Sequence, residues 1–361
     1  MTELKKPITM EKVILQRAAG MQKPVSGTLE LLPLCNMNCD MCYIRMSREE
    51  MKKRGRMRTA EEWIDLCEEM KQEGVLFLLL TGGEPLIFPG FRKLYKALKQ
   101  MGMILTVNTN GTLIDEDWAD FFAEYPPRRI NITLYGTNEK TYQNLCHYTG
   151  FEKAVNGIRL LRDRNIDVKL NGSATKANKD QLEELYEIAN QLKVPIHVDT
   201  YMIPGLRDKN LPIEQQSRLN PEDAAEAELL VLKNEMAEKD YYEYRKTILE
   251  RVDAPAAYPK GMGCMAGNCA FQVNWKGEMH PCLSLSEPSA KVFEEGFKKS
   301  WEYISSGSKL LQLGDKCVSC KYRPVCKTCV ASAFLETGKY DGVSEYLCKI
   351  AEHMVKLLRE E

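Results

Sequence analysis

Between residues 27 and 201, short runs of apolar and β-branched residues alternate with longer segments whose apolar positions recur at helical spacing. This alternation predicts strands joined by helices, which pair in parallel through right-handed crossovers. We therefore expect an α/β fold of six β/α units, arranged as an open sheet or a partial (β/α)6 barrel. The expected strands are 28–34, 75–80, 104–108, 130–135, 168–171 and 196–201. The expected helices are 59–72, 91–101, 115–124, 151–164 and 180–192.

Polar residues follow several of these strands at the point where each strand ends. They include the stretches 81–84, 108–111 and 135–136. In parallel α/β folds the carboxyl ends of the strands share one edge, and the functional site lies there. We therefore expect the site at this edge.

The pattern changes after residue 201. A proline-containing loop (204–221), a charged helix (222–251) and a linker (253–263) precede a cysteine-rich segment with one hairpin, which turns at Lys276-Gly277, and one C-terminal helix at 346–359. A segment with so few helices and strands buries too little apolar surface to fold alone, so we expect metal to stabilise it. Three parts are expected: an N-terminal extension (1–26), a barrel with its following helix (27–252) and a small cysteine-rich domain (253–361).

Net charge and hydropathy limit the classes of partner that the protein can bind. Fifty Lys and Arg residues face 51 Asp and Glu residues, for a net charge of -1, so no global field attracts nucleic acid or anionic lipid. The longest apolar run, 75–80, is far below the ~20 residues of a membrane span. The N-terminus has no apolar export segment, which predicts a cytoplasmic protein.

Thirteen cysteines point to metal binding. An odd number without an export signal argues against a disulfide framework, because the cytosol keeps thiols reduced. Three of them, Cys35, Cys39 and Cys42, directly follow the first expected strand. Three thiolates can hold one metal centre and leave a coordination position open, whereas a closed zinc or 4Fe-4S site takes four. The alternative is three buried or zinc-binding cysteines with a remote fourth ligand.

The second expected strand ends in Gly82-Gly83-Glu84-Pro85. Two glycines permit close backbone approach to a ligand, and a carboxylate beside them can hold an ammonium group. Alone, the same four residues could form an ordinary strand-to-helix turn. Together, Cys-x-x-x-Cys-x-x-Cys after strand one and Gly-Gly-Glu-Pro after strand two resemble the radical S-adenosylmethionine (radical SAM) superfamily over about residues 25–240.

The resemblance implies a partial barrel that binds SAM and a 4Fe-4S cluster. Cys35, Cys39 and Cys42 would hold the cluster, and its free iron would chelate the methionyl moiety of SAM. Reductive cleavage of SAM would give a 5'-deoxyadenosyl radical. The implied SAM contacts are Gly82, Gly83, Glu84, Pro85, Asn108, Asn110, Thr133 and Asn171. This chain departs from the family pattern at Met41, where an aromatic residue is common, and at Tyr135, where an acid is common.

A second group of cysteines lies between Cys264 and Cys348. Its paired Cys-x-x-Cys steps also fit structural zinc ribbons. Their order resembles the SPASM domain, which implies two auxiliary 4Fe-4S clusters and three clusters in all. By that resemblance the first set is Cys264, Cys269, Cys282 and Cys329, and the second is Cys317, Cys320, Cys326 and Cys348. Two residues separate Cys326 from Cys329, where the pattern usually has three.

The other candidate residues have simpler interpretations. Cys67 is expected to be a small buried hydrophobe. Cys146 is either buried or a hydrogen-atom donor near the mouth. His147 and His280 are expected to be structural or solvent-facing. The basic run 46–58 is a solvated face, or alternatively a surface that docks a peptide.

SPASM relatives mostly act on peptides, so the resemblance implies oxidative modification of a ribosomally made peptide through a thioether or carbon–carbon cross-link. Sulfatase-maturase-like modification is an alternative, although Leu283 stands where those enzymes carry a catalytic aspartate. Peptide epimerisation is another. Alternatives of a different class are a non-catalytic iron-sulfur electron carrier and a zinc-stabilised binding module. The expected partners are a flavodoxin- or ferredoxin-type electron donor and, for leader recognition, a separate leader-peptide-binding protein, the barrel rim or the segment 45–58.

Overall fold

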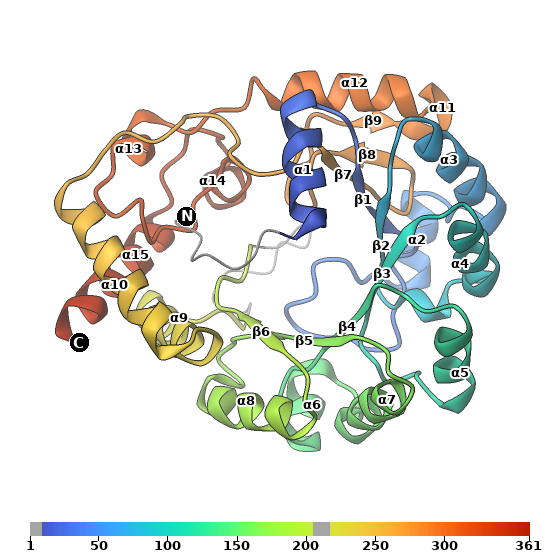
Figure 1. Cartoon of the computed structure of the whole chain (residues 1–361), viewed down its shortest axis with the longest axis horizontal. Coiled ribbons are helices and arrows are strands. Elements are labelled where there is room, and N and C mark those ends of the chain that lie inside the picture. The colour runs from blue at the N-terminus through green and yellow to red at the C-terminus, as the bar shows by residue number, and fades with distance from the viewer. Residues whose placement is uncertain (1–8, 205–216) are drawn as a thin grey trace.

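The computed structural model describes residues 9–204 and 217–361, and within them nine strands form one sheet in the order β6-β5-β4-β3-β2-β1-β7-β8-β9. Figure 1 shows this sheet as a curved arc with helices along its outer side. The strands are β1 (Ser26–Glu30), β2 (Phe77–Thr81), β3 (Ile104–Thr109), β4 (Arg129–Thr133), β5 (Val168–Ser173), β6 (Ile196–Asp199), β7 (Ala270–Val273), β8 (Glu278–His280) and β9 (Ala290–Lys291).

The helices of the N-terminal two thirds are α1 (Met10–Met21), α2 (Arg48–Arg54), α3 (Ala60–Gln72), α4 (Phe91–Gln100), α5 (Glu116–Glu124), α6 (Glu139–Cys146), α7 (Phe151–Asp163), α8 (Leu182–Gln191), α9 (Pro221–Glu235) and α10 (Glu238–Asp253), with the 3-10 helices η1 (Pro85–Ile87) and η2 (Lys179–Gln181). Those that follow are α11 (Val292–Glu295), α12 (Phe297–Ser308), α13 (Asp315–Val318), α14 (Val330–Thr337) and α15 (Glu345–Glu360).

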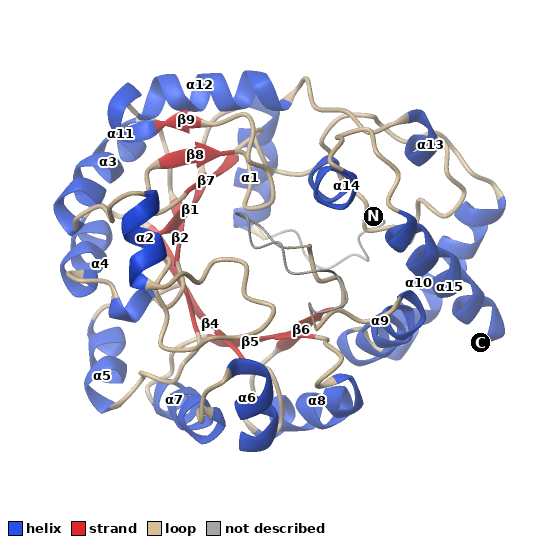
Figure 2. Ribbon diagram, turned by 180° about the vertical axis from the view of Figure 1, so that it is seen from behind, coloured by secondary structure: helices blue, strands red, loops and turns tan. Residues whose placement is uncertain are grey.

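The parallel strands β1 to β6 confirm the six predicted β/α units. The register sets Leu29 beside Leu80 and Leu78 beside Leu105, and all four side chains are buried. Burying such side chains contributes roughly 1.5–3 kcal/mol each, before entropy is counted. These alternate positions therefore hold one face of the sheet against the outer helices (Figure 2). The other face is left to line the interior.

The cysteine-rich part extends this same sheet. Strand β7 pairs in parallel with β1, so that Ser26 lies opposite Ala270 and Thr28 opposite Gln272. Strands β7 and β8 form the predicted hairpin through Gly277, whose φ is 93°. A Cβ atom at Gly277 would lie 2.3 Å from the Phe293 ring, so this tight turn requires glycine. The sheet thus crosses the predicted boundary at residue 253.

The prediction of one helix over 222–251 is wrong, because the chain forms α9 and α10 there. The break falls at Met236 and Ala237, which both have extended backbone. Each helix packs separately on α15, and their shared core contains Tyr241, Ile248 and Met354. No proline or glycine marks the break in the sequence. Tertiary packing, and not local propensity, produces it.

Secondary structure in the C-terminal part is richer than predicted. Helices α11 to α14 lie between the expected hairpin and the expected terminal helix, which α15 confirms. Helix α12 carries Trp301, whose ring contacts Phe271 of β7. Helix α1, within the predicted N-terminal extension, was also not expected. None of the helices in residues 9–204 and 217–361 combines the length and the apolar character that a membrane crossing requires.

Candidate active site at the mouth of the barrel

A cavity of about 450 Å³ lies at the carboxyl ends of the parallel strands, as the sequence predicted. Its wall combines the loop that follows β1 with the ends of β2 to β6 and with a short stretch of the C-terminal part. The predicted residues that line it are Cys35, Cys39, Cys42, Gly82, Gly83, Asn108, Asn110 and Thr133. Glu84, Pro85, Cys146 and Asn171 are not among the lining residues that the structure describes.

The three cysteines of the first group occupy one loop and are half-buried. Two backbone N–H groups point at their sulfur atoms, from Met37 to Cys35 Sγ at 3.4 Å and from Arg45 to Cys42 Sγ at 3.3 Å. Hydrogen bonds to sulfur are one means by which proteins tune iron-sulfur clusters. Burial raises the pKa of Cys35 to about 12, so a metal bound to this thiolate would have to supply the free energy that removes the proton.

The C-terminal end of α6 forms hydrogen bonds with the cysteine loop. The backbone N–H groups of Asn38 and Asp40 each donate to a carbonyl, of Cys146 and Leu145 respectively, at 3.0 Å. The Asp40 carboxylate also lies 2.6 Å from His147 Nε2. His147 is therefore a solvent-facing residue with a structural contact, which agrees with the expectation of a structural or solvent-facing histidine. Its partner Asp40 is a neighbour that the sequence did not reveal.

The Gly82-Gly83 turn is pressed against the chain that leads into Cys35. A Cβ atom at Gly82 would lie 2.6 Å from the Leu32 carbonyl oxygen, and one at Gly83 only 2.2 Å from that of Leu34. The Gly83 N–H donates to the Leu32 carbonyl at 2.8 Å. The two glycines thus permit a close approach of backbone to backbone. This contact fixes the distance between the end of β2 and the chain that leads into the cysteine loop.

Glu84 lies behind the cavity wall and has no exposed surface. Its carboxylate accepts hydrogen bonds from the Thr109 hydroxyl at 2.8 Å, from the Asn110 N–H at 2.8 Å and from the Leu86 N–H at 3.0 Å. Burial raises its pKa to about 7, against the lowering effect of these bonds. Glu84 therefore ties the tip of β2 to the tip of β3. Its predicted contact with the amino group of SAM stays a prediction.

The asparagines at the strand ends also hold one another. Asn110 Nδ2 donates to Asn36 Oδ1 at 2.8 Å and lies 3.7 Å from Cys35 Sγ. Asn131 Nδ2 donates to Asn108 Oδ1 at 2.8 Å. Asn171 pairs with Thr133 in the sheet, yet only Thr133 lines the cavity. Asn110 thus joins the cysteine loop directly to β3.

The two spare thiols are both buried, at 0% exposure. Cys67 lies within the main hydrophobic core, which confirms the expected small hydrophobe. The Cys146 thiol forms a hydrogen bond with Cys39, and this bond, followed by burial, raises the pKa of Cys39. Cys146 therefore lies beside the cysteine loop and away from the described cavity wall. Hydrogen-atom donation by Cys146 stays a prediction.

In each of the two predicted C-terminal sets, the structure places the cysteines near one another. Cys317, Cys320, Cys326 and Cys348 all line one small cavity of about 50 Å³. In the other set, burial raises the pKa of Cys282 to about 11, and the nearby thiolates of Cys329 and Cys264 add to this effect. Cys269 is likewise close to Cys264. In the described residues no three His, Cys, Asp or Glu side chains form the ligand set of a single metal ion.

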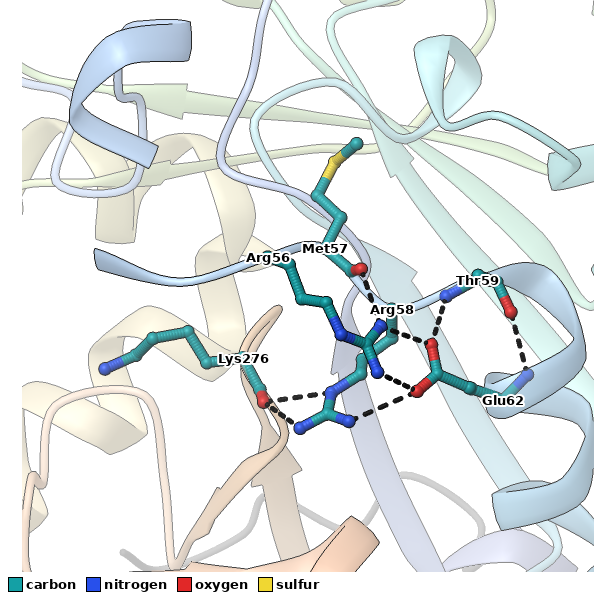
Figure 3. Close-up of polar contacts among 6 residues, drawn as sticks. All are labelled: Arg56, Met57, Arg58, Thr59, Glu62 and Lys276. Carbon is teal, nitrogen blue, oxygen red and sulfur yellow. Dashed lines mark hydrogen bonds and ion pairs between the residues drawn. The ribbon is translucent and has the colours of Figure 1, made fainter. Parts of the chain in front are cut away.

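A second cavity of about 420 Å³ adjoins the mouth and shares Leu283 and Ser284 with it. Lys276, in the hairpin turn, forms part of its wall. The Arg58 guanidinium holds this turn to the barrel by donating to the Lys276 carbonyl at 3.0 and 3.2 Å (Figure 3). Glu62 binds both Arg58 and Arg56, and these bonds, Arg56 first, lower its pKa to about 2. Two arginines of the basic run are thus engaged within the protein.

Several lining residues were not singled out from the sequence as site residues. They include Ser173, Asp199, Tyr201 and Ser284. Ser173 and Asp199 are the last residues of β5 and β6, and Tyr201 follows β6, so strand position was the available signal. Asp199 contacts His197, which lowers the pKa of that carboxyl. Ser284 could not have been found, since only the fold brings the Cys282 loop to the mouth.

Comparison with known proteins agrees with this geometry. Residues 29–189 match the family model described as Radical SAM superfamily. An AdoMet-dependent heme synthase of Methanosarcina barkeri is 25% identical over 331 residues, which cover 86% of this chain and 92% of that protein. The sporulation killing factor maturation protein SkfB of Bacillus subtilis is 22% identical over 302 residues, which cover 82% of this chain and 68% of that protein.

Among solved structures, that of Streptococcus suis SuiB bound to precursor peptide SuiA superposes with a TM-score of 0.69 at 16% identity. The superposition covers 96% of this chain and 84% of SuiB, and it shows a shared fold. The family match, the cysteine loop and the open parallel sheet agree with one another. Residues 29–189 are therefore a radical SAM domain.

Proposed function

We propose that this radical SAM enzyme oxidatively modifies a ribosomally made peptide, by forming a thioether or a carbon–carbon cross-link. One observation carries the proposal. The mouth cavity has the three-cysteine loop on one side and Leu283 and Ser284 on another, directly after Cys282 of the C-terminal set. A substrate in this cavity would lie between a SAM-binding cluster and an auxiliary cluster that can accept an electron from it.

The residues present fit the proposed cofactors. Cys35, Cys39 and Cys42 offer three thiolates and would leave one iron of a 4Fe-4S cluster for SAM. Two sets of four cysteines would hold two auxiliary clusters. When bound and reduced, the first cluster and SAM supply the radical that abstracts a hydrogen atom from the substrate. The site residues would then bind and orient SAM and the peptide.

Glycine backbone and strand-end side chains are the proposed SAM contacts. Gly82, Gly83, Asn108, Asn110 and Thr133 line the cavity beside the cysteine loop. Asn110 bonds to Asn36 of the cysteine loop, Asn108 to Asn131 and Gly83 to Leu32, so these bonds already hold the wall in place without a ligand. Such preorganisation places the reacting atoms without reorganisation at the moment of reaction.

The comparisons support a peptide substrate in two ways. SkfB is described as a maturation protein for a sporulation killing factor, and its similarity extends over 82% of this chain. SuiB has been solved with a precursor peptide bound, and it has the same fold. We further propose a flavodoxin- or ferredoxin-type protein as electron donor, and a separate leader-peptide-binding protein as one route of recognition.

A second candidate is an oxidation on an iron tetrapyrrole. The heme synthase of Methanosarcina barkeri is 25% identical to this chain and is matched over 92% of its length. Sulfatase-maturase-like activity has less support, because Leu283 and not an aspartate lines the mouth after Cys282. Epimerisation through Cys146 is also less supported, because this thiol is buried beside Cys39.

The experiment is to reconstitute the enzyme anaerobically and incubate it with SAM, reductant and peptides encoded beside its gene, in light and in heavy water. A parallel reaction contains an iron tetrapyrrole in place of peptide. A peptide that loses two hydrogen atoms supports cross-linking, whereas solvent deuterium uptake without net change indicates epimerisation. A tetrapyrrole that changes mass while every peptide is unchanged would reject the peptide proposal. Absence of SAM cleavage would favour an electron carrier or a zinc-binding module.

A further inference from the structure

Tyr201 connects the mouth cavity to the C-terminal part. It follows β6 and lines the mouth. Its hydroxyl donates a 2.8 Å hydrogen bond to Glu336 Oε1 on α14. The adjacent Thr200 hydroxyl accepts a 2.9 Å bond from Lys327 Nζ. The edge of the barrel mouth is therefore fixed to the segment that carries Cys326 and Cys329.

Glu336 forms a buried ion pair with Arg218. Arg218 Nη2 lies 2.5 Å from Glu336 Oε1, and the two side chains are only 2% and 5% exposed. The Arg218 guanidinium carbon also lies 3.4 Å from the centre of the Tyr346 ring. Removing one partner of such a pair leaves the other as an uncompensated buried charge. The charge balance here consequently depends on both residues.

Glu336 of this ion pair lies on α14, and Tyr346, which contacts Arg218, lies on α15; each of these two helices adjoins or carries a cysteine of a C-terminal set. Helix α14 begins directly after Cys329, its N-cap, and Glu336 lies about two turns further along. Helix α15 carries Tyr346 two residues before Cys348. Cys329 is near enough to Tyr201 to add to the rise in the pKa of that phenol, after burial and Glu336. The ion pair therefore lies between the mouth and the cysteine sets.

We propose that Tyr201, Arg218 and Glu336 form a positioning unit that fixes the auxiliary cluster bound through Cys329 relative to the mouth and balances the charge beside it. This inference rests on the proposed function, because it requires the auxiliary cluster. Local charge, hydrogen bonding and burial set the reduction potential of iron-sulfur clusters. The unit would thus set the reduction potential of the auxiliary cluster that accepts an electron from the substrate in the mouth. None of its members exchanges protons or electrons in this role.

The test is to measure the potentials of the clusters at pH 8.5 by redox titration followed by electron paramagnetic resonance, without substrate. Arg218→Gln leaves the Glu336 charge and should make an auxiliary cluster harder to reduce. Glu336→Gln leaves the Arg218 charge and should make it easier to reduce. A tenfold change in the reduced-to-oxidised ratio, equal to 59 mV for one electron, is expected in each case. The double variant should return close to the unmodified enzyme.

Matched variants keep the test decisive. Arg92→Gln removes an exposed ion pair with Asp117 and should leave every potential unchanged. Tyr201→Phe keeps the ring but removes the bond to Glu336, so a smaller shift is expected even if a charge variant fails to fold. The proposal would be overturned if Tyr201→Phe, Arg218→Gln and Glu336→Gln all kept their full iron content and all had unchanged cluster potentials. Only about four irons per unmodified chain would instead overturn the auxiliary clusters themselves.

Discussion

The cysteine loop at the barrel mouth and the C-terminal cysteine sets are supported in different ways. Backbone bonds to Gly83, Leu145 and Cys146 fix the loop and the chain that leads into it, and residues of the loop pack against the main core. Around Cys317, the local core holds only a few more buried residues, Leu313, Val318 and Ala333. We therefore predict that the loop keeps its shape without metal, because a large core supports it. We predict that the segment around Cys317, with so small a core, depends on metal for its own fold.

The largest expected effect tests the barrel side of this comparison. Replacing Cys35, Cys39 and Cys42 together by Ala should abolish SAM cleavage and lower the iron content from about twelve to about eight per chain, because one 4Fe-4S cluster is lost. The auxiliary absorbance and the thermal unfolding temperature should change little. Chromatography of 5'-deoxyadenosine measures SAM cleavage, and iron analysis measures the loss of the cluster. Retained deoxyadenosine formation would show that the radical arises elsewhere.

The next effect tests the C-terminal side. Cys317→Ala should remove about four irons and expose the region 313–333 to protease, because the small core around Cys317 would lose the cluster that closes it. Limited proteolysis of the anaerobic holoenzyme measures this. Cys67→Ala is the matched control, since Cys67 is buried in the barrel core. It should keep its iron and its protease resistance. Equal resistance in both variants would contradict the dependence on metal.

A smaller effect concerns the contact under the loop. Gly83→Ala places a Cβ 2.2 Å from the Leu34 carbonyl oxygen, so the loop must shift. We expect a loss of roughly 1–3 kcal/mol in unfolding free energy, as for other overpacked sites, together with weaker SAM binding. Gly20→Ala in α1 is the control, because nothing lies within 4 Å of its Cβ. Denaturant unfolding and SAM titration should separate the two. Equal SAM affinities would contradict the proposed role of this contact.

The smallest effect is one of pH. Asp199 and then Glu235 raise the pKa of His197 from 6.5 to about 9. The charged histidine therefore stabilises the fold fully below pH 6.5, and this contribution is lost as the pH rises through about 9. His197 is 44% exposed, so solvent screening reduces the expected contribution to about 1 kcal/mol.

His197→Gln should therefore lower the unfolding temperature at pH 6.5 and have little effect at pH 9.5. Unfolding of the holoenzyme at both values tests this against the unmodified chain. An equal loss at both pH values would show that His197 acts by packing and not by charge.

The sequence predicted the barrel well, because each strand and its helix are read from local periodicity. It could not predict the pairing of β1 with β7, since residues Ser26 and Ala270 are far apart in the chain and their patterns carry no register. The break between α9 and α10 was missed for a similar reason: α15, remote in sequence, decides it. Long-range packing was the missing information in each case.

The site shows the same division. The motif residues Cys35 and Gly83 were identified from spacing, and the cavity contains them. The direction of the Glu84 side chain was not predictable, because Thr109 and the Asn110 backbone, which bind it, lie on another strand. The bond between Tyr201 and Glu336, 135 positions later in the chain, was likewise not predictable. Local spacing names the chemistry, whereas the tertiary fold decides which side chains reach the cavity.

The most direct test of the central assignment is electron-nuclear double resonance on the reduced, reconstituted enzyme with SAM labelled with 15N at its amino group. If the Cys35–Cys42 loop holds a cluster with an iron that binds SAM, the label should couple to the cluster spin, and the coupling should vanish in the triple Ala variant. No coupling in an enzyme with its full iron content, or coupling that persists in the triple variant, would contradict the placement of SAM at this loop.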